Sequence, residues 1–231
     1  MSHTPATPTE ARASGSLVRL AYDRLKAAIE AHHFEPGQRM REAEIAEWLG
    51  ISRTPTRDAL RQLESEGLLA AAPRRGLIVA TLDHNSVSEI YDVRESLESL
   101  AAGRAARQAT SAELAILHEN LRRQSEADPE DLALLLELNS QFHDAICRAS
   151  RNRYLVLTLR SLETPLALLR GTTYTAPGRP AEALQQHREI LEAIERRDEE
   201  AARRLAGEHV RAAERIRLMS LAESTVTGGF D

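Results

Sequence analysis

Three histidines and one asparagine interrupt otherwise apolar helical stripes in the second half of the chain. His143 lies one turn after Asn139, and His187 and His209 each lie eleven residues from Asp198. If Asp198 marks the turn of an antiparallel helical hairpin, both histidines lie at the same height, about 16 Å from that turn. Imidazole nitrogens that face one core can satisfy one another through a metal ion. The pattern predicts a divalent-metal site made of Asn139, His143, His187 and His209, for zinc, or for nickel, manganese or iron.

A single histidine on an apolar stripe is more often a hydrogen-bonded core residue than a ligand, and His118 illustrates that alternative. The matched set of three favours a metal, and three protein ligands with open positions could accept a small anion. Arg94 flanks a separate apolar stripe and could hold the carboxylate of an effector. An ion pair with Glu98, one turn further on, is the alternative for Arg94.

A second group of residues could read DNA. Arg53, Arg57 and Arg61 recur at a spacing of four, so they share one face of a helix. Arginine pairs with guanine through two hydrogen bonds, and hydroxyl groups near a helix N-terminus bind phosphate. The full predicted DNA-binding set is Ser52, Arg53, Thr54, Thr56, Arg57, Arg61, Arg74, Arg75 and Gly76.

The elements that must position the arginines lie near the N-terminus. Helical periodicity predicts helices at about 17–31, 41–49 and 52–66, broken by Pro36-Gly37, Gly50 and Gly67. Two short apolar runs, 68–71 and 77–81, flank a turn at 73–76 and predict a hairpin. Three helices and a hairpin describe a winged helix-turn-helix domain at residues 17–82, after a disordered leader at 1–16.

The rest of the chain is predicted to be an all-α antiparallel bundle at residues 83–222, which positions the histidines. Turn signals separate six helices, at about 86–107, 111–127, 129–149, 152–170, 180–196 and 198–221. The stretch 171–180 is the longest irregular segment. A disordered tail is expected at 223–231.

Composition limits the class of protein. The chain has 231 residues, of which 42% are apolar, and no apolar run is long enough for a membrane span. The absence of a signal-like stretch and the single cysteine, Cys147, predict a cytoplasmic protein. The net charge of −5 argues against DNA binding by itself, but residues 1–80 carry eleven basic and ten acidic side chains. The acidic excess therefore lies in the C-terminal part.

The N-terminal segment EIAEWLGISRTPTRDALRQLESEGLLAAAPRRGLIV closely resembles the DNA-binding half of GntR-family regulators. The resemblance implies that Arg53 and Arg57 contact the operator, with Ser52, Thr54 and the hairpin assisting. Ala43 departs from the pattern, because some members carry an arginine in the middle of the second helix.

The C-terminal segments YDVRESLESLAAGRAA, NSQFHDAI, QQHREILEAI and EHVRAAE resemble the FCD-type effector domain of the FadR-like branch. In metal-binding members, the positions of Asn139, His143, His187 and His209 hold the ligands.

These expectations combine into one hypothesis and two alternatives. A homodimer would bind a near-palindromic, double-stranded operator, most simply as a repressor, and a small organic acid bridging the metal and Arg94 would control it. A direct divalent-metal sensor is the first alternative. A metal-dependent hydrolase is the second, but no Glu or Asp is placed as its general base, so no enzyme is expected.

Overall fold

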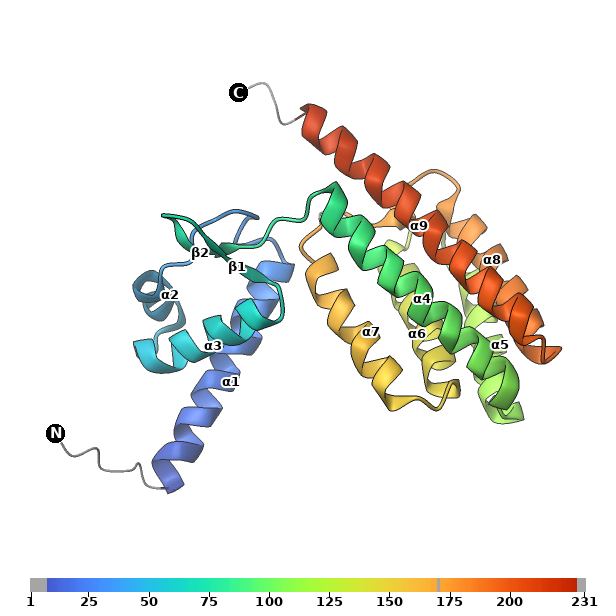
Figure 1. Ribbon diagram of the computed structural model, residues 1–231, viewed down its shortest axis with the longest axis horizontal. Coiled ribbons are helices and arrows are strands. Elements are labelled where there is room, and N and C mark those ends of the chain that lie inside the picture. The colour runs from blue at the N-terminus through green and yellow to red at the C-terminus, as the bar shows by residue number, and fades with distance from the viewer. Residues whose placement is uncertain (1–7, 170, 228–231) are drawn as a thin grey trace. The chain divides into compact units, whose positions relative to one another are not determined.

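The computed structural model describes residues 8–169 and 171–227, and none of the helices in these ranges could span a lipid bilayer. The chain divides into two compact units (Figure 1). The first comprises Met1–Leu82 and Glu163–Leu169, and the second comprises Asp83–Leu162 and Arg170–Asp231.

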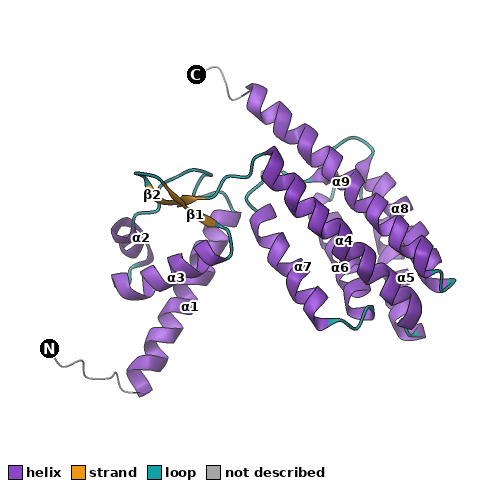
Figure 2. Cartoon of the chain, viewed as in Figure 1, coloured by secondary structure: helices purple, strands orange, loops and turns teal. Residues whose placement is uncertain are grey.

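The first unit contains three helices and a two-stranded sheet (Figure 2). The elements are α1 (Pro8–Glu30), α2 (Glu42–Leu49), α3 (Arg53–Ser65), β1 (Leu69–Ala72) and β2 (Gly76–Val79). The strands pair antiparallel, from Leu69 opposite Val79 to Ala72 opposite Gly76. Aliphatic side chains such as Leu25, Ile29, Leu63 and Leu68 fill the core. This arrangement is the predicted winged helix-turn-helix, and we call the β1–β2 hairpin the wing.

The link between α2 and α3 fixes how α3 is presented. Gly50 adopts a left-handed conformation with φ of 71°, and its N–H caps α2 by bonding to the carbonyls of Ala46 and Glu47. A residue without Cβ adopts this conformation at little cost. Ser52 is extended and precedes α3 directly. The tight turn therefore lets α3 begin at Arg53.

The second unit is helical throughout its regular elements. They are α4 (His84–Gln108), α5 (Ser111–Glu126), α6 (Leu132–Ala149), α7 (Arg153–Leu166), the 3₁₀ helix η1 (Thr173–Thr175), α8 (Arg179–Glu195) and α9 (Glu199–Thr227). The last residues of α7 belong to the first unit. Figure 1 shows α4 and α9 side by side. Small residues such as Ala102, Ala105 and Ala206 are buried in this core, which allows close approach of the helices.

The main differences from the sequence prediction lie at element ends. Helix α1 begins at Pro8 and not at Leu17, so residues 8–16 are helical and not a disordered leader. Proline is tolerated in a first helical turn, and the Ala, Glu and Arg residues that follow favour helix. Helix α9 continues to Thr227, beyond the expected start of the tail. The rest of the expected leader and tail lies outside the described residues.

Candidate DNA-reading surface and histidine centre

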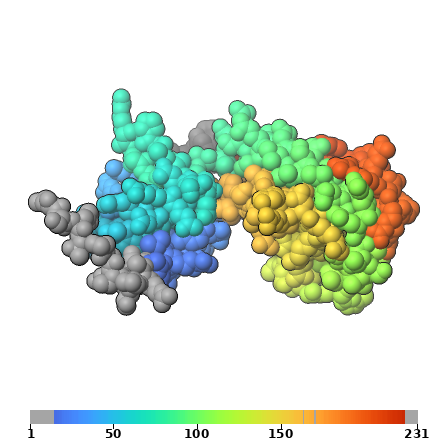
Figure 3. Space-filling model, turned by 60° about the horizontal axis from the view of Figure 1, so that its bottom comes forward, coloured from blue at the N-terminus to red at the C-terminus, as the bar shows by residue number. Residues whose placement is uncertain are grey.

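Helix α3 separates its basic residues from its apolar ones. Ala59, Leu60 and Leu63 are buried in the core of the first unit, whereas Arg53, Arg57 and Arg61 are exposed. Figure 3 shows α3 in cyan on the surface of this unit, with the wing beside it. The arrangement presents a row of guanidinium groups on a helix of the size that fits a DNA major groove.

One of these arginines has a specific partner. Arg57 donates from Nε to Oε2 of Glu42 at 2.7 Å and from Nη2 to Oε1 at 2.8 Å. These two hydrogen bonds join α3 to the first turn of α2 and lower the pKa of Glu42 below its ordinary value. Sequence reasoning missed Glu42, because its distance of fifteen positions from Arg57 gives no helical-spacing signal.

The structure corrects one of the predicted DNA contacts. Thr56 is fully buried, and its hydroxyl donates to the backbone carbonyl of Ser52 at 3.0 Å. Its hydroxyl therefore stabilises the start of α3 and does not face the solvent. Ser52 and Thr54 are exposed at the same end of the helix.

The wing carries the remaining predicted contacts. Arg74, Arg75 and Gly76 are all exposed at the turn between the strands. Arg74 and Gly76 have positive φ values of 63° and 74°. The guanidinium of Arg75 donates to the carbonyl of Gly37 at 3.3 Å. The turn thus brings two cationic side chains to one tip.

In the second unit, the structure brings three of the predicted metal ligands together. His143 on α6, His187 on α8 and His209 on α9 each offer one ring nitrogen, and these atoms all lie within 4.8 Å of one another. The ring centroids of His187 and His209 are 4.7 Å apart. His187 and His209 are buried, and His143 is partly exposed. The equal offsets from Asp198 do place the two histidines of the α8–α9 hairpin side by side.

Each ring is oriented by an oxygen atom at its Nδ1. His143 Nδ1 lies 3.0 Å from Oε2 of Glu98, and His187 Nδ1 lies 3.1 Å from Oε1 of Gln124. His209 Nδ1 lies 2.8 Å from Oε1 of Gln186. An oxygen acceptor at Nδ1 fixes the proton there and leaves Nε2 as a ligand atom, which is the usual second shell of metal-bound histidine.

The protonation of the centre also suits a cation. Burial, with smaller contributions from nearby positive charges, holds the pKa of His187 and of His209 well below the usual range, so both rings are neutral at pH 7. His187 Nε2 is buried without a hydrogen-bond partner among the described residues. A buried nitrogen lone pair without a partner is costly. The residues present therefore fit a divalent metal ion.

The fourth predicted ligand, Asn139, has a partner of its own. Its Oδ1 accepts a hydrogen bond of 2.9 Å from the hydroxyl of Tyr174 in η1. The side chain lies one turn before His143 on α6. Tyr174 thus fixes the orientation of the amide, and a carbonyl oxygen has a second lone pair for a metal.

Arg94 adopts the alternative that the sequence left open. Its Nε and Nη2 donate to Oε1 of Glu98 at 3.0 and 2.8 Å. Burial alone would raise the pKa of the Glu98 carboxyl, but the Arg94 guanidinium and the hydrogen bond with His143 outweigh burial, and the net shift is downward. Glu98 therefore joins Arg94 to the histidine centre. His118, away from this centre, bonds Glu195 at the surface.

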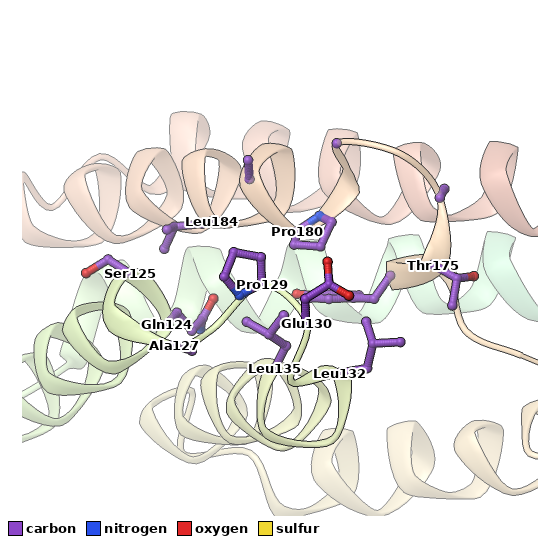
Figure 4. A pocket seen from close by; sticks show the side chains of 14 residues that line it. Gln124, Ser125, Ala127, Pro129, Glu130, Leu132, Leu135, Thr175, Pro180 and Leu184 are labelled. Atoms are coloured by element: carbon purple, nitrogen blue, oxygen red, sulfur yellow. The ribbon is translucent and has the colours of Figure 1, made fainter.

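A cavity of about 550 Å³ lies in the second unit (Figure 4). Its apolar lining includes Leu132, Leu135 and Leu184, and its polar lining includes Gln124 and Tyr174. These two polar residues bond His187 and Asn139 respectively. The cavity therefore reaches the immediate surroundings of the histidine centre.

Comparisons with known proteins agree with both halves of this description. Residues 17–79 match the model of bacterial regulatory proteins of the gntR family, and residues 89–212 match the FCD domain. The chain is 35% identical to the HTH-type transcriptional regulator YdhC of Bacillus subtilis, over 79% of this chain and 82% of that protein. It is 27% identical to the HTH-type transcriptional repressor RspR of Escherichia coli, over 76% of this chain and 77% of that one.

Among solved structures, E. coli McbR/YncC is similar with a TM-score of 0.69 and 27% identity, covering 88% of this chain and 98% of that chain. Together the matches identify a DNA-binding transcription regulator rather than an enzyme. The chain belongs to the GntR family of bacterial regulatory proteins and combines its helix-turn-helix domain with an FCD domain.

Proposed function

We propose that this regulator is a metal-containing repressor that a small organic acid releases from its operator. A DNA-binding domain at residues 17–82 would read the operator, and an effector domain at 83–222 would hold the metal and the acid. The observation that carries the proposal is the histidine centre, where three imidazoles each have Nδ1 at an oxygen and lie close enough to share one ion.

The operator-reading residues in this proposal are the exposed ones. Arg53 and Arg57 would contact base edges, with Arg61 and the wing arginines at the phosphates. Ser52, Thr54 and Gly76 would approach the backbone. A homodimer would present two copies of α3 to a near-palindromic site. The name of RspR supports repression as the sign of regulation.

The metal in this proposal is a divalent ion, most simply zinc, held by His143, His187 and His209 with Asn139 as fourth ligand. Such an ion supplies open coordination positions that a carboxylate can occupy. The chain's own residues orient the imidazoles and exclude water from two of them. Arg94 is one candidate for the second contact of the acid, provided that it exchanges part of its pairing with Glu98 for the ligand.

Operator binding under four conditions tests the proposal. Fluorescence anisotropy with a duplex from the chain's own promoter would be measured for metal-free protein, zinc-loaded protein, and each with succinate. We expect tight binding by the zinc-loaded protein and a several-fold to hundred-fold loss on adding acid, since allosteric couplings are typically about 1–3 kcal/mol. A response to zinc that no carboxylate modifies would instead establish the direct metal sensor. Equal binding under all four conditions would overturn both.

A further inference from the structure

Arg179, in the first turn of α8, has the largest fully buried side chain among the described residues, and this side chain carries a positive charge. The residue is 2% exposed. Its Nη1 donates to Oε1 of Gln186 at 2.9 Å, and its Nε has no hydrogen-bond partner within the part of the chain that the structure describes. A buried arginine is normally paired with an anion through several of its donors.

The charge of Arg179 is poorly compensated where it lies. Its acidic neighbour, Glu182, is 3.3 Å from Nη1, but the Glu182 side chain is 51% exposed and its charge is screened by water. The first turn of a helix is also the positive end of the helix dipole, which disfavours a cation. A buried cation with an open donor at this end of a helix is a place where an anion would be strongly stabilised.

Arg179 is connected to the histidine centre through one atom. Oε1 of Gln186 accepts from Nη1 of Arg179 and also faces Nδ1 of His209 at 2.8 Å. The positive charge of Arg179 is close enough to help lower the pKa of His187 and of His209, after burial as the main cause. It also opposes the rise that burial gives to the pKa of Tyr174. The guanidinium therefore shares one interior with the predicted metal ligands.

The residues directly before and after Arg179 face open space, whereas the Arg179 side chain is buried and is not itself part of the cavity lining. Gly178 and Pro180 line the cavity of about 550 Å³, together with Tyr174. Figure 4 shows Pro180 at the edge of this cavity, across from Leu132 and Leu135. The cavity has room for the carbon skeleton of a small molecule, and its apolar lining suits such a skeleton.

We infer that Arg179 binds a carboxylate group of the organic acid and so forms the cationic half of the effector site. The inference rests on the proposed function, because it supplies the second anchor for the acid that the metal would hold. It also assigns to Arg179 the contact that the sequence predicted for Arg94. A ligand that occupies both the metal and Arg179 must carry two acidic groups, or one acidic group and one metal-binding oxygen.

Calorimetric titration of the full-length, zinc-loaded protein with succinate tests this inference, with neutral succinamide as the comparison ligand. Arg179→Gln should weaken succinate binding by about 10- to 100-fold, the value expected when a charged hydrogen-bond donor is lost. Arg179→Lys should restore part of the affinity, because it restores the charge but not the planar donor set. Arg188→Gln, at an exposed arginine of the same helix, is the matched control and should bind as the unaltered protein does.

Zinc content without acid, measured for each variant, should stay at one ion per chain and shows that the centre is intact. If Arg179→Gln does not fold, the Nε–H resonance of Arg179 in the unaltered protein, assigned with Arg179→Lys, gives a second readout and should shift on adding succinate. The inference would be overturned if Arg179→Gln binds succinate with unchanged affinity, or if only Arg94→Gln loses succinate affinity. Either result would leave the proposed function standing. Absence of succinate binding to the unaltered protein would overturn both for this acid.

Discussion

Glu42 holds the guanidinium of Arg57 by two hydrogen bonds and thereby ties the predicted reading helix to the helix before it. The pair is exposed, so it contributes little to the stability of the fold. The pair instead restricts the orientation of Arg57, because a guanidinium held by a carboxylate has fewer orientations than a free one. A carboxylate at this place also repels DNA phosphates unless Arg57 neutralises it.

We expect Glu42→Gln to raise binding to unrelated DNA and to lower discrimination for the operator. Removing one negative charge strengthens phosphate attraction, whereas loss of the paired geometry weakens base reading. The ratio of operator to scrambled-duplex affinity should fall about tenfold, the value of one good base contact. Anisotropy titrations at two salt concentrations measure both effects. A ratio that stays constant or rises would contradict the orienting role of Glu42.

Replacing Arg53 and Arg57 by alanine should abolish selective binding while the helix remains folded. Both side chains are exposed, so their removal leaves the packing of α3 intact. Operator affinity should fall about a hundredfold or more for the pair, down to the affinity for unrelated DNA. Arg19→Ala, at an exposed arginine of α1, is the control and should retain selectivity. Retained selectivity in the double variant would show that α3 is not the helix that reads the operator.

Thr56→Val separates stability from DNA binding. The hydroxyl of Thr56 is buried and bonds Ser52, so the variant should lower the free energy of unfolding by about 1 kcal/mol. At a temperature where both proteins are folded, operator affinity should stay the same. Urea denaturation followed by circular dichroism gives the first quantity, and anisotropy gives the second. A loss of operator affinity without a loss in the free energy of unfolding would show that Thr56 contacts DNA.

Removing the metal should destabilise the FCD domain. An ion present at a hundredfold excess over its Kd stabilises the folded state by about 2.7 kcal/mol, which is about 5–10 °C in Tm for a domain of this size. Adding zinc to chelator-treated protein should raise Tm by that amount, and His143→Gln should remove most of the rise. His118→Gln is the matched control, because His118 lies at the surface paired with Glu195. Equal rises in Tm on adding zinc to both variants would exclude the histidine centre as the zinc site.

The amide partners of the histidines should tune metal affinity. Gln124→Leu and Gln186→Leu remove the oxygens that face Nδ1 of His187 and His209. Loss of such a partner typically weakens metal binding by about 10- to 100-fold. Competition with a zinc-binding dye measures the change, and Gln185→Leu, an exposed neighbour on α8, serves as control. Unchanged affinity in Gln124→Leu and Gln186→Leu would show that these bonds only support the apo fold.

The sequence predicts the histidine cluster because helical spacing converts directly into position. His187 and His209 have equal offsets from one turn, and a hairpin of two straight helices must bring them together. The winged helix-turn-helix is predictable for the same reason, since Gly50 and the wing turn mark where each element ends.

The partners of these residues could not be predicted in this way. Gln124, Gln186 and Glu42 are residue types that usually face solvent, and their roles depend on which helices pack together. The burial of Arg179 likewise follows from tertiary packing, because an arginine beside a proline at a helix start gives no signal of its own. For Thr56 the sequence prediction failed in the opposite direction, because a residue expected at the DNA interface is buried. A hydroxyl beside exposed arginines can still face the core.

Close packing of α4 against α9 gives a last prediction, at Gly207. A Cβ at this position would lie 2.9 Å from Oγ of Ser99 and 3.2 Å from Oε1 of Glu95. Glycine to alanine in a helix usually stabilises a protein, but here the added methyl group displaces side chains of the neighbouring helix. Gly207→Ala should therefore lower the free energy of unfolding by about 1 kcal/mol.

The double variant Gly207→Ala with Ser99→Ala separates crowding from other causes. Ser99→Ala removes the oxygen nearest to the added methyl group, so the two changes should couple favourably by about 0.5–1 kcal/mol in a double-mutant cycle. Gly15→Ala is the matched control for helix propensity, because nothing lies within 4 Å of a Cβ built there. It should be neutral or stabilising. If Gly207→Ala behaves like Gly15→Ala, α4 and α9 are further apart than the structure places them.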